Sequence, residues 1–161
     1  MNASDIDFVL EVENNVDIWD VSNNNSNYCR GDIERLLADL EDTHRSKQAR
    51  YVICDPANEN RLGTVDLTDI DFQKGIASVG ILIHDPKDRR KGFASDALRS
   101  VEDIALEIGI VKLHAVVHQG NEPSLALFSK LNYQNVTNDL SLDRIVDDFI
   151  NVEHFCKCLE N

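Results

Sequence analysis

The sequence predicts one α/β (α+β) domain with a single central sheet, spanning residues 1–161. Three observations lead to this class. A chain of 161 residues suits one domain rather than two. Short apolar runs typical of strands lie among longer segments whose apolar residues recur at helical spacing. No internal repeat, low-complexity tract or Pro/Gly-rich linker divides the chain.

The N-terminal part predicts two helices joined by a loop. Ser4 and Asp5 can cap a helix over residues 5–14, where apolar side chains recur at helical spacing. The polar run at 23–27 predicts a loop. Residues 32–44 predict the second helix, because its apolar residues lie along one side.

Three strands are expected next, over residues 50–54, 61–70 and 76–84. In the second strand apolar and polar residues alternate, so Asp66 is expected on the polar face. The third strand is a nearly continuous apolar run, which is typical of a central strand covered on both faces.

The clearest helix of the sequence covers residues 93–108, and Gly109 is suited to end it. A strand follows over residues 112–118. Asn121 to Ser124 then predict the start of another helix, because Pro is favoured in the first turn. Two weaker strands are expected toward the C-terminus, near residues 139–146 and 149–158.

The net charge of −13 disfavours nucleic acid and anionic membranes as partners, since both are negatively charged. This charge suits a cationic acceptor such as a polyamine or a basic peptide end, and equally suits a role in solubility alone. No apolar run approaches the roughly 20 residues that span a bilayer. The start of the chain lacks the basic and apolar stretches of a secretory signal. We therefore expect a cytoplasmic protein.

The four cysteines show no paired CxxC spacing, and no pair of histidines lies nearby at ligand spacing. We expect reduced thiols and no metal site. These cysteines are Cys29, Cys54, Cys156 and Cys158.

The most informative segment joins the third strand to the long helix. The first turn of a helix has backbone N–H groups without internal partners and roughly half a positive charge, so it can bind phosphate. Gly92 and Ala94 are small enough for a ligand to approach the backbone there. Four cations lie just before the helix, where cations are unfavourable without an anion: Lys87, Arg89, Arg90 and Lys91. An ordinary loop with exposed cations is the other interpretation. Neither GxxxxGK(S/T) nor GxGxxG is present, so this is not a P-loop or a Rossmann site.

Two segments carry a resemblance to a known family. Residues 89–94, Arg-Arg-Lys-Gly-Phe-Ala, resemble motif A of the GNAT acetyltransferases, in which Gln or Arg, then Gly, then Gly or Ala recur at fixed spacing. Residues 117–133 resemble motif B, and the apolar strand 79–83 resembles the family's fourth strand. Segments 5–22 and 63–67 are similar to the ribosomal-protein N-terminal and spermidine acetyltransferase branch.

The resemblance implies a mixed, mostly antiparallel sheet of about six to seven strands, splayed between the fourth and fifth, with about four helices. It implies an N-acetyltransferase that moves the acetyl group of acetyl-CoA to a primary amine by direct attack in a ternary complex. The acceptor would be a polyamine, a peptide N-terminus or another small amine. The residues implied in cofactor binding are Ile81, Leu82, Ile83, Arg89, Arg90, Lys91, Gly92, Phe93, Ala94, Ser95, Asn121, Phe128 and Lys130.

The sequence departs from the family at three places. The family's first edge strand is missing or shortened, and an exposed sheet edge favours a homodimer or strand replacement by another chain. Phe128 stands where many members have a Tyr that protonates the departing thiolate. Asn132 replaces the motif B Gly, and Asn tolerates the left-handed conformation. The first two departures motivate an alternative function, a non-catalytic acyl-CoA-binding regulatory module. A purely structural domain that binds no cofactor is the third hypothesis.

An amine must lose a proton before it attacks a thioester, so a general base is expected. Asp66 is the first candidate, because it lies mid-strand among apolar residues and matches an acidic position of the spermidine-like branch. A solvent-facing carboxylate is the alternative interpretation. His118, at the end of a strand, is the second candidate, against an ordinary structural histidine. A backbone N–H near Leu82 or Ile83 is expected to stabilise the oxyanion.

Overall fold

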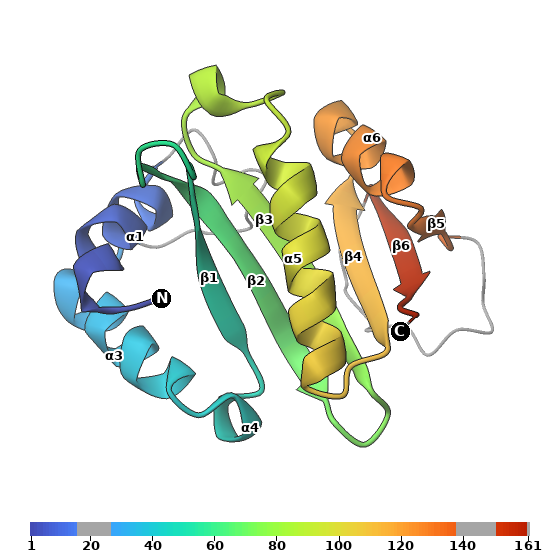
Figure 1. Cartoon of the computed structure of the whole chain (residues 1–161), viewed down its shortest axis with the longest axis horizontal. Helices are drawn as coiled ribbons and strands as arrows, with labels where there is room; N and C mark the ends of the chain where they lie inside the picture. Colours follow the sequence, from blue (N-terminus) through green and yellow to red (C-terminus); the bar gives the residue numbers. More distant parts are fainter. Residues whose placement is uncertain (16–26, 138–150, 161) are drawn as a thin grey trace.

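A six-stranded sheet forms the centre of the computed structural model, which describes residues 1–15, 27–137 and 151–160 (Figure 1). The strand order is β1-β2-β3-β4-β6-β5. Neighbouring strands are antiparallel except β3 and β4, which are parallel. The predicted α/β class with a mixed, mostly antiparallel sheet is confirmed. The strands are β1 (Ala49–Cys54), β2 (Arg61–Asp71), β3 (Ile76–Ile83), β4 (Lys112–His118), β5 (Gln134–Asn135) and β6 (Val152–Cys158).

The helices of the described residues surround this sheet. They are the 3-10 turns η1 (Ala3–Asp5) and η3 (Pro86–Asp88), and the α-helices α1 (Ile6–Glu13), α3 (Arg30–Leu40), α4 (Thr43–Ser46), α5 (Phe93–Glu107) and α6 (Glu122–Lys130). None of them is both long enough and apolar enough to cross a bilayer.

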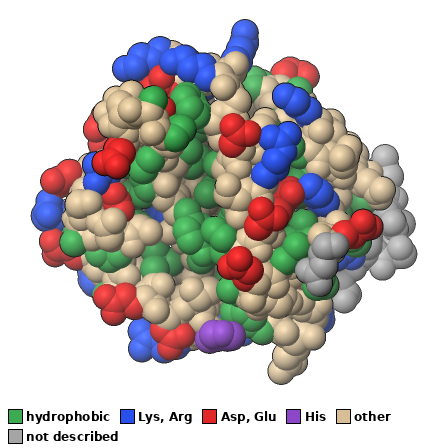
Figure 2. Space-filling view, viewed as in Figure 1, with side chains coloured by type: hydrophobic (Ala, Val, Ile, Leu, Met, Phe, Trp, Pro, Cys, Tyr) green, Lys and Arg blue, Asp and Glu red, His purple; other side chains and the backbone are tan. Residues whose placement is uncertain are grey.

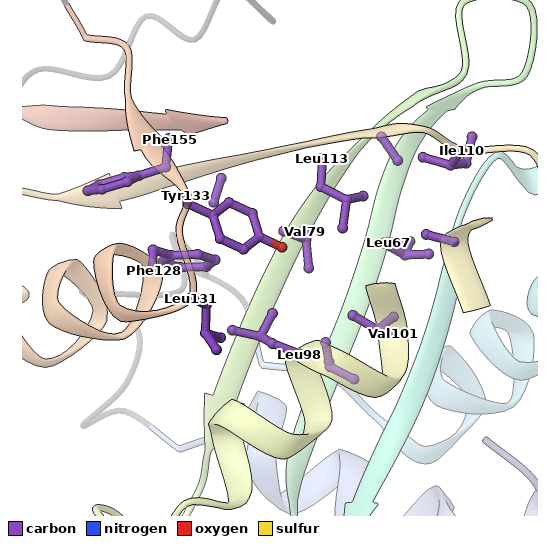
Figure 3. Close-up of a cluster of buried hydrophobic side chains, with 14 of the residues drawn as sticks. Leu67, Val79, Leu98, Val101, Ile110, Leu113, Phe128, Leu131, Tyr133 and Phe155 are labelled. Carbon is purple, nitrogen blue, oxygen red and sulfur yellow. The ribbon is translucent and has the colours of Figure 1, made fainter. Parts of the chain in front are cut away.

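Helix α5 crosses one face of the sheet, over β2 and β3 (Figure 1). Its apolar side packs on alternate apolar residues of the strands and forms the main core (Figure 3). Fully buried members include Leu67, Leu98, Val101 and Leu113. The helix predicted over 93–108 is therefore confirmed. Gly109 follows it with φ 88°, the left-handed conformation expected one residue past a helix end.

Helices α1 and α3 pack on each other beside β1 (Figure 1). Ile6, Val9 and Ile33 form a second, smaller core between them, and Val52 of β1 packs against it. The single helix predicted over residues 32–44 is wrong, because the structure has two separate helices there, α3 and α4. The chain leaves α3 after Leu40, and Asp42 caps the separate helix α4 by accepting a hydrogen bond from the Arg45 amide at 3.1 Å.

The predicted strands over 50–54, 61–70, 76–84, 112–118 and 149–158 all appear with small shifts at their ends. The short strand β5 was not predicted, because two residues carry no periodic signal. The strand expected near 139–146 and most of the loop at 23–27 fall outside the described residues.

Strand β3 is central, as predicted, but the part of the chain that the structure describes buries only one of its faces. Ala77, Val79 and Ile83 lie in the main core under α5. On the opposite face Leu82 is half-buried and Gly80 is exposed. This uncovered face matters for the site, because Asp66 of β2 lies directly across from Gly80.

Candidate functional site

Strands β3 and β4 separate soon after they meet. They pair only at Ile76 with Lys112, Ala77 with Leu113, and Ser78 with His114. Beyond these residues β3 stays paired with β2 on its other side, and β4 stays paired with β6. Residues 79–83 of β3 and 115–118 of β4 therefore diverge, as Figure 1 shows, and we call these two segments the splay. Within the described residues, no strand pairs with the inner edges of the splay.

The alternation of β3 decides which of its backbone groups face the splay. The amide of His84 donates to the carbonyl oxygen of Leu62, on the β2 side, at 2.8 Å. Because successive residues of a strand direct their backbone groups to opposite sides, those of Leu82 point toward β2 and those of Ile81 and Ile83 point into the splay. The carbonyl oxygen of Ile83 accepts a hydrogen bond from Arg89 Nε at 3.1 Å, which agrees with this orientation.

The loop between β3 and α5 partly neutralises its own cations. Lys87 pairs with Asp85 at 2.6 Å, and Lys91 pairs with Asp88 at 2.8 Å. The pairing holds the pKa of Asp85 below its usual value and raises the pKa of Lys87. Two of the four cations thus have carboxylate partners within the loop itself. The expectation that an external anion is needed to balance all four is therefore corrected. Figure 2 shows Lys and Arg side chains gathered at the end of the molecule where this loop lies.

The first turn of α5 has no side-chain cap. Its N-cap residue is Gly92, with φ 96°, and Arg90 is also in the left-handed region with φ 62°. The backbone turns twice within three residues and then enters the helix. A Cβ built on Gly92 would meet only the Asp96 Oδ2 atom, at 3.9 Å. The backbone at Gly92 is thus open to a ligand, as the phosphate hypothesis requires.

Helix α6 begins at the end of β4, so its N-terminus also lies at the wide end of the splay (Figure 1). Asn121 caps this helix, because its Oδ1 accepts from the Ser124 amide at 3.2 Å. Lys130, in the last turn, is exposed. Asn132 has φ 64°, which confirms the left-handed turn expected after the helix.

Phe128 of α6 is buried, with 3% of its surface exposed. Its ring meets Tyr133 edge to face at a centroid distance of 5.0 Å and stacks on Phe155 at 6.0 Å (Figure 3). This position in the aromatic core explains why an apolar ring is tolerated there. The hydroxyl of Tyr133 has no hydrogen-bond partner among the described residues. Its burial, followed by the neighbouring Glu102, raises the pKa of Tyr133.

Asp66 lies on the face of the sheet opposite α5, as its alternation predicted, and is held there by Arg50 of β1. Arg50 Nε donates to Asp66 Oδ1 at 2.7 Å, and a second guanidinium nitrogen donates to Oδ2 at 3.0 Å. Arg50 also contacts Glu13 of α1 at 2.5 Å. Burial raises the pKa of Asp66, Arg50 opposes that rise, and Glu13 adds to it. A Cβ built on Gly80, opposite Asp66, would meet no atom of residues 1–15, 27–137 and 151–160 within 4 Å.

His118, the second candidate base, is exposed at the end of β4. Its Nδ1 lies 3.1 Å from the amide of Gly120 and accepts that hydrogen bond. A neutral ring in this arrangement carries its proton on Nε2, so it offers a donor outward rather than a lone pair.

Arg50 and His114 were not assigned to the site from the sequence, and Glu13 was considered only as a possible contact for a cationic acceptor or as part of a solvated helix surface. Arg50 and Glu13 join Asp66 through strand pairing and helix packing, which no short spacing reports. His114 occupies the last paired position before the splay. Burial lowers the pKa of His114, and Lys112 and His154 lower it further. From the sequence, His114 could be placed only on the face of strand 112–118 opposite Leu113 and Ala115.

Comparison with known proteins gives a consistent result. Residues 1–134 match the family model described as an acetyltransferase (GNAT) domain. The alpha/beta-tubulin-N-acetyltransferase 9 of Homo sapiens is 31% identical over 71 residues, covering 44% of this chain and 34% of that protein. The N-acetyltransferase 9-like protein of Nematostella vectensis is 36% identical over 67 residues, covering 38% of this chain and 32% of that protein. The matched part thus spans about a third of the length of these relatives.

Solved structures resemble the whole chain. Spermidine N-acetyltransferase from Vibrio cholerae, in complex with CoA and spermine, superposes with a TM-score of 0.82 at 19% identity. The match covers 99% of this chain and 92% of that chain. A domain from Methanocaldococcus jannaschii gives a TM-score of 0.74 at 15% identity and covers 99% of this chain and 95% of its own. At these identities the likeness establishes the fold.

Proposed function

The chain belongs to the GNAT acetyltransferase family, and we propose that it transfers the acetyl group of acetyl-CoA to a primary amine. The observation that carries this proposal is the splay of β3 and β4, with the uncapped first turn of α5 at its wide end. An unpaired strand edge supplies hydrogen bonds to an extended arm, and a helix N-terminus supplies amides and positive potential to a diphosphate. Acetyl-CoA has both parts in one molecule.

The diphosphate is proposed to rest on the amides of the loop and first turn at residues 90–95. Arg89 holds this loop against the end of β3, because its guanidinium donates hydrogen bonds to the carbonyl oxygens of Ile83 and His84. The pantetheine arm would pair with the splay-facing groups of Ile81 and Ile83, while Leu82 would contribute its side chain. Phe128 is buried in the aromatic core, so it is proposed to act by anchoring α6 rather than by direct contact. Lys130 of this helix would lie near the cofactor's far arm, and Asn121 at its start would contact the cofactor.

The reaction is a direct displacement. The lone pair of the neutral amine forms a bond to the thioester carbon, and the π electrons of the C=O bond move onto oxygen to give an oxyanion. The C=O bond then re-forms, the C–S bond breaks, and the thiolate leaves with the electron pair. We propose that Asp66 takes the amine proton, because the open space over Gly80, its neighbour across β2 and β3, gives an acceptor amine room to approach it. The N–H of Ile83, which points into the splay, is the proposed oxyanion donor. With Phe128 unable to donate, water is proposed to protonate the thiolate.

The acceptor class is proposed from charge and from the relatives. The chain carries a net charge of −13, which favours a cationic amine. The names of the relatives describe acetylation of tubulin and of spermidine, and each of these acceptors presents an amine. A polyamine or a peptide N-terminal amine is therefore the proposed acceptor, in the cytoplasm.

A homodimer through β1 is the proposed assembly. β1 is the outermost strand on its side of the described sheet, and an unpaired edge favours pairing with another chain. The amino group of Met1 reaches this edge, at 3.4 Å from the carbonyl oxygen of Arg50. Light scattering should give twice the chain mass, and a monomer at high concentration would contradict this assembly.

An acceptor screen tests the function. Purified protein is incubated with acetyl-CoA and a panel of polyamines, aminoglycosides and peptides with free N-termini, and release of free thiol is followed. Thiol release that depends on one amine class supports the proposal. Calorimetry with CoA separates the alternatives: binding without turnover favours a regulatory acyl-CoA-binding module, and absence of binding to folded protein would refute both.

A further inference from the structure

Arg50 grips the Asp66 carboxylate at both of its oxygens. The two residues face each other across β1 and β2, and their hydrogen bonds of 2.7 and 3.0 Å form the parallel, two-pronged arrangement that a guanidinium makes with a carboxylate. The third guanidinium nitrogen is directed to Glu13 at 2.5 Å. One cation therefore serves two carboxylates, one from the sheet and one from α1.

This cluster is well shielded from water. The side chains of Arg50, Asp66 and Glu13 are 19%, 22% and 20% exposed. Charged groups in such places interact strongly, because little solvent screens them. Arg50 from β1 and Glu13 from α1 are the charged groups of the described residues that act on Asp66. Burial and Glu13 both favour the protonated carboxyl, and Arg50 is the opposing influence.

We propose that Arg50 is a positioning residue for acetyl transfer, which fixes the Asp66 carboxylate in its ionised form beside the open space over Gly80. This inference rests on the proposed function and on Asp66 as its base. Without the guanidinium, burial and the Glu13 carboxylate would both raise the pKa of Asp66 with nothing from Arg50 to oppose them. A protonated Asp66 cannot accept the proton of the amine.

The proposal makes opposite predictions for the two partners of Asp66. Arg50→Lys keeps the charge but loses the two-pronged grip. It should move the acidic limb of the kcat–pH profile to higher pH, and kcat on that limb should fall about tenfold if the limb moves by one pH unit. Glu13→Gln removes the carboxylate that opposes ionisation of Asp66 and keeps a group that can accept from Arg50. It should move the same limb to lower pH.

A second ion pair on β2 provides a matched control. Arg61 Nε lies 2.7 Å from Asp5 Oδ1, and this pair also joins the sheet to the N-terminal helical segment, away from Gly80. If Arg50 only fastens α1 to the sheet, Arg50→Lys and Arg61→Lys should alter thermal stability alike and leave the pH profile unchanged. If Arg50 positions the base, only the Arg50 variant shifts the acidic limb.

The experiment records kcat–pH profiles of the wild type and these variants with the best amine of the acceptor screen. It also follows the Asp66 carboxyl carbon by ¹³C NMR titration, which requires no turnover. We expect the Asp66 titration and the acidic limb to move together, upward in Arg50→Lys and downward in Glu13→Gln. Unmoved titrations in folded variants would overturn the inference, as would an acidic limb that persists in Asp66→Asn. A wild type that titrates as expected and transfers no acetyl group would instead refute the proposed function.

Discussion

The N-cap glycine of α5 permits a test of the phosphate site with an internal control. Gly92 and Gly109 flank the same helix with similar backbone angles, φ 96° and φ 88°. Among the described residues, a Cβ built on Gly92 would meet one atom, at 3.9 Å, and a Cβ built on Gly109 would meet none within 4 Å. Gly92→Ala and Gly109→Ala therefore differ little in steric contact, and both introduce a side chain into a left-handed conformation.

The expected cost to stability is similar for both variants. Placing a residue with a Cβ in the left-handed region costs about 1–2 kcal/mol. For a chain of this size each 1 kcal/mol lowers Tm by about 2–4 °C. Differential scanning calorimetry should therefore show a decrease of about 2–8 °C in each variant.

The two variants should differ in their affinity for CoA. Gly92 carries the backbone on which the diphosphate is proposed to rest, whereas Gly109 lies at the opposite end of α5. A hydrogen bond to a charged group contributes about 1.5–3 kcal/mol, so loss of one raises Kd about tenfold to 150-fold. Titration calorimetry with CoA should show this increase for Gly92→Ala and an unchanged Kd for Gly109→Ala. Equal affinities in the two variants would refute the assignment of the diphosphate to this turn.

Three further outcomes are expected. Asp66→Asn should lower turnover by about 10² or more, as loss of a general base does, and unchanged turnover at saturating acceptor would exclude Asp66. Phe128→Tyr should lower the free energy of unfolding in urea by about 1–3 kcal/mol, because the added hydroxyl enters an aromatic core; an unchanged midpoint would show that the hydroxyl finds a partner. The pKa of His114 is lowered by burial and then by Lys112 and His154, so the unfolded chain binds the proton more readily. Stability should therefore fall as pH decreases from the ordinary histidine pKa of about 6.5 toward the folded value. His114→Gln should reduce this dependence, which urea unfolding at a series of pH values measures.

Local sequence was enough to predict most of the elements and the position of the candidate cofactor loop. The helix over 93–108, the strand before it and Gly92 between them are encoded within neighbouring residues, because helical spacing and the small N-cap act over one or two turns. The left-handed turn at Asn132 was predictable for the same reason. The break between α3 and α4 was missed, since Asp42 competes locally with a helical pattern that continues through it.

The contacts between distant elements at the site could be known only from the folded chain. Register between β1 and β2 brings Arg50 onto Asp66, and packing of α1 adds Glu13 to them. The pairing of Lys87 and Lys91 with loop carboxylates likewise depends on how the backbone turns. A sequence pattern reports which face a residue occupies, because that follows from local periodicity. It does not report which residue of a distant element lies opposite, because that depends on how the whole sheet and its helices pack together.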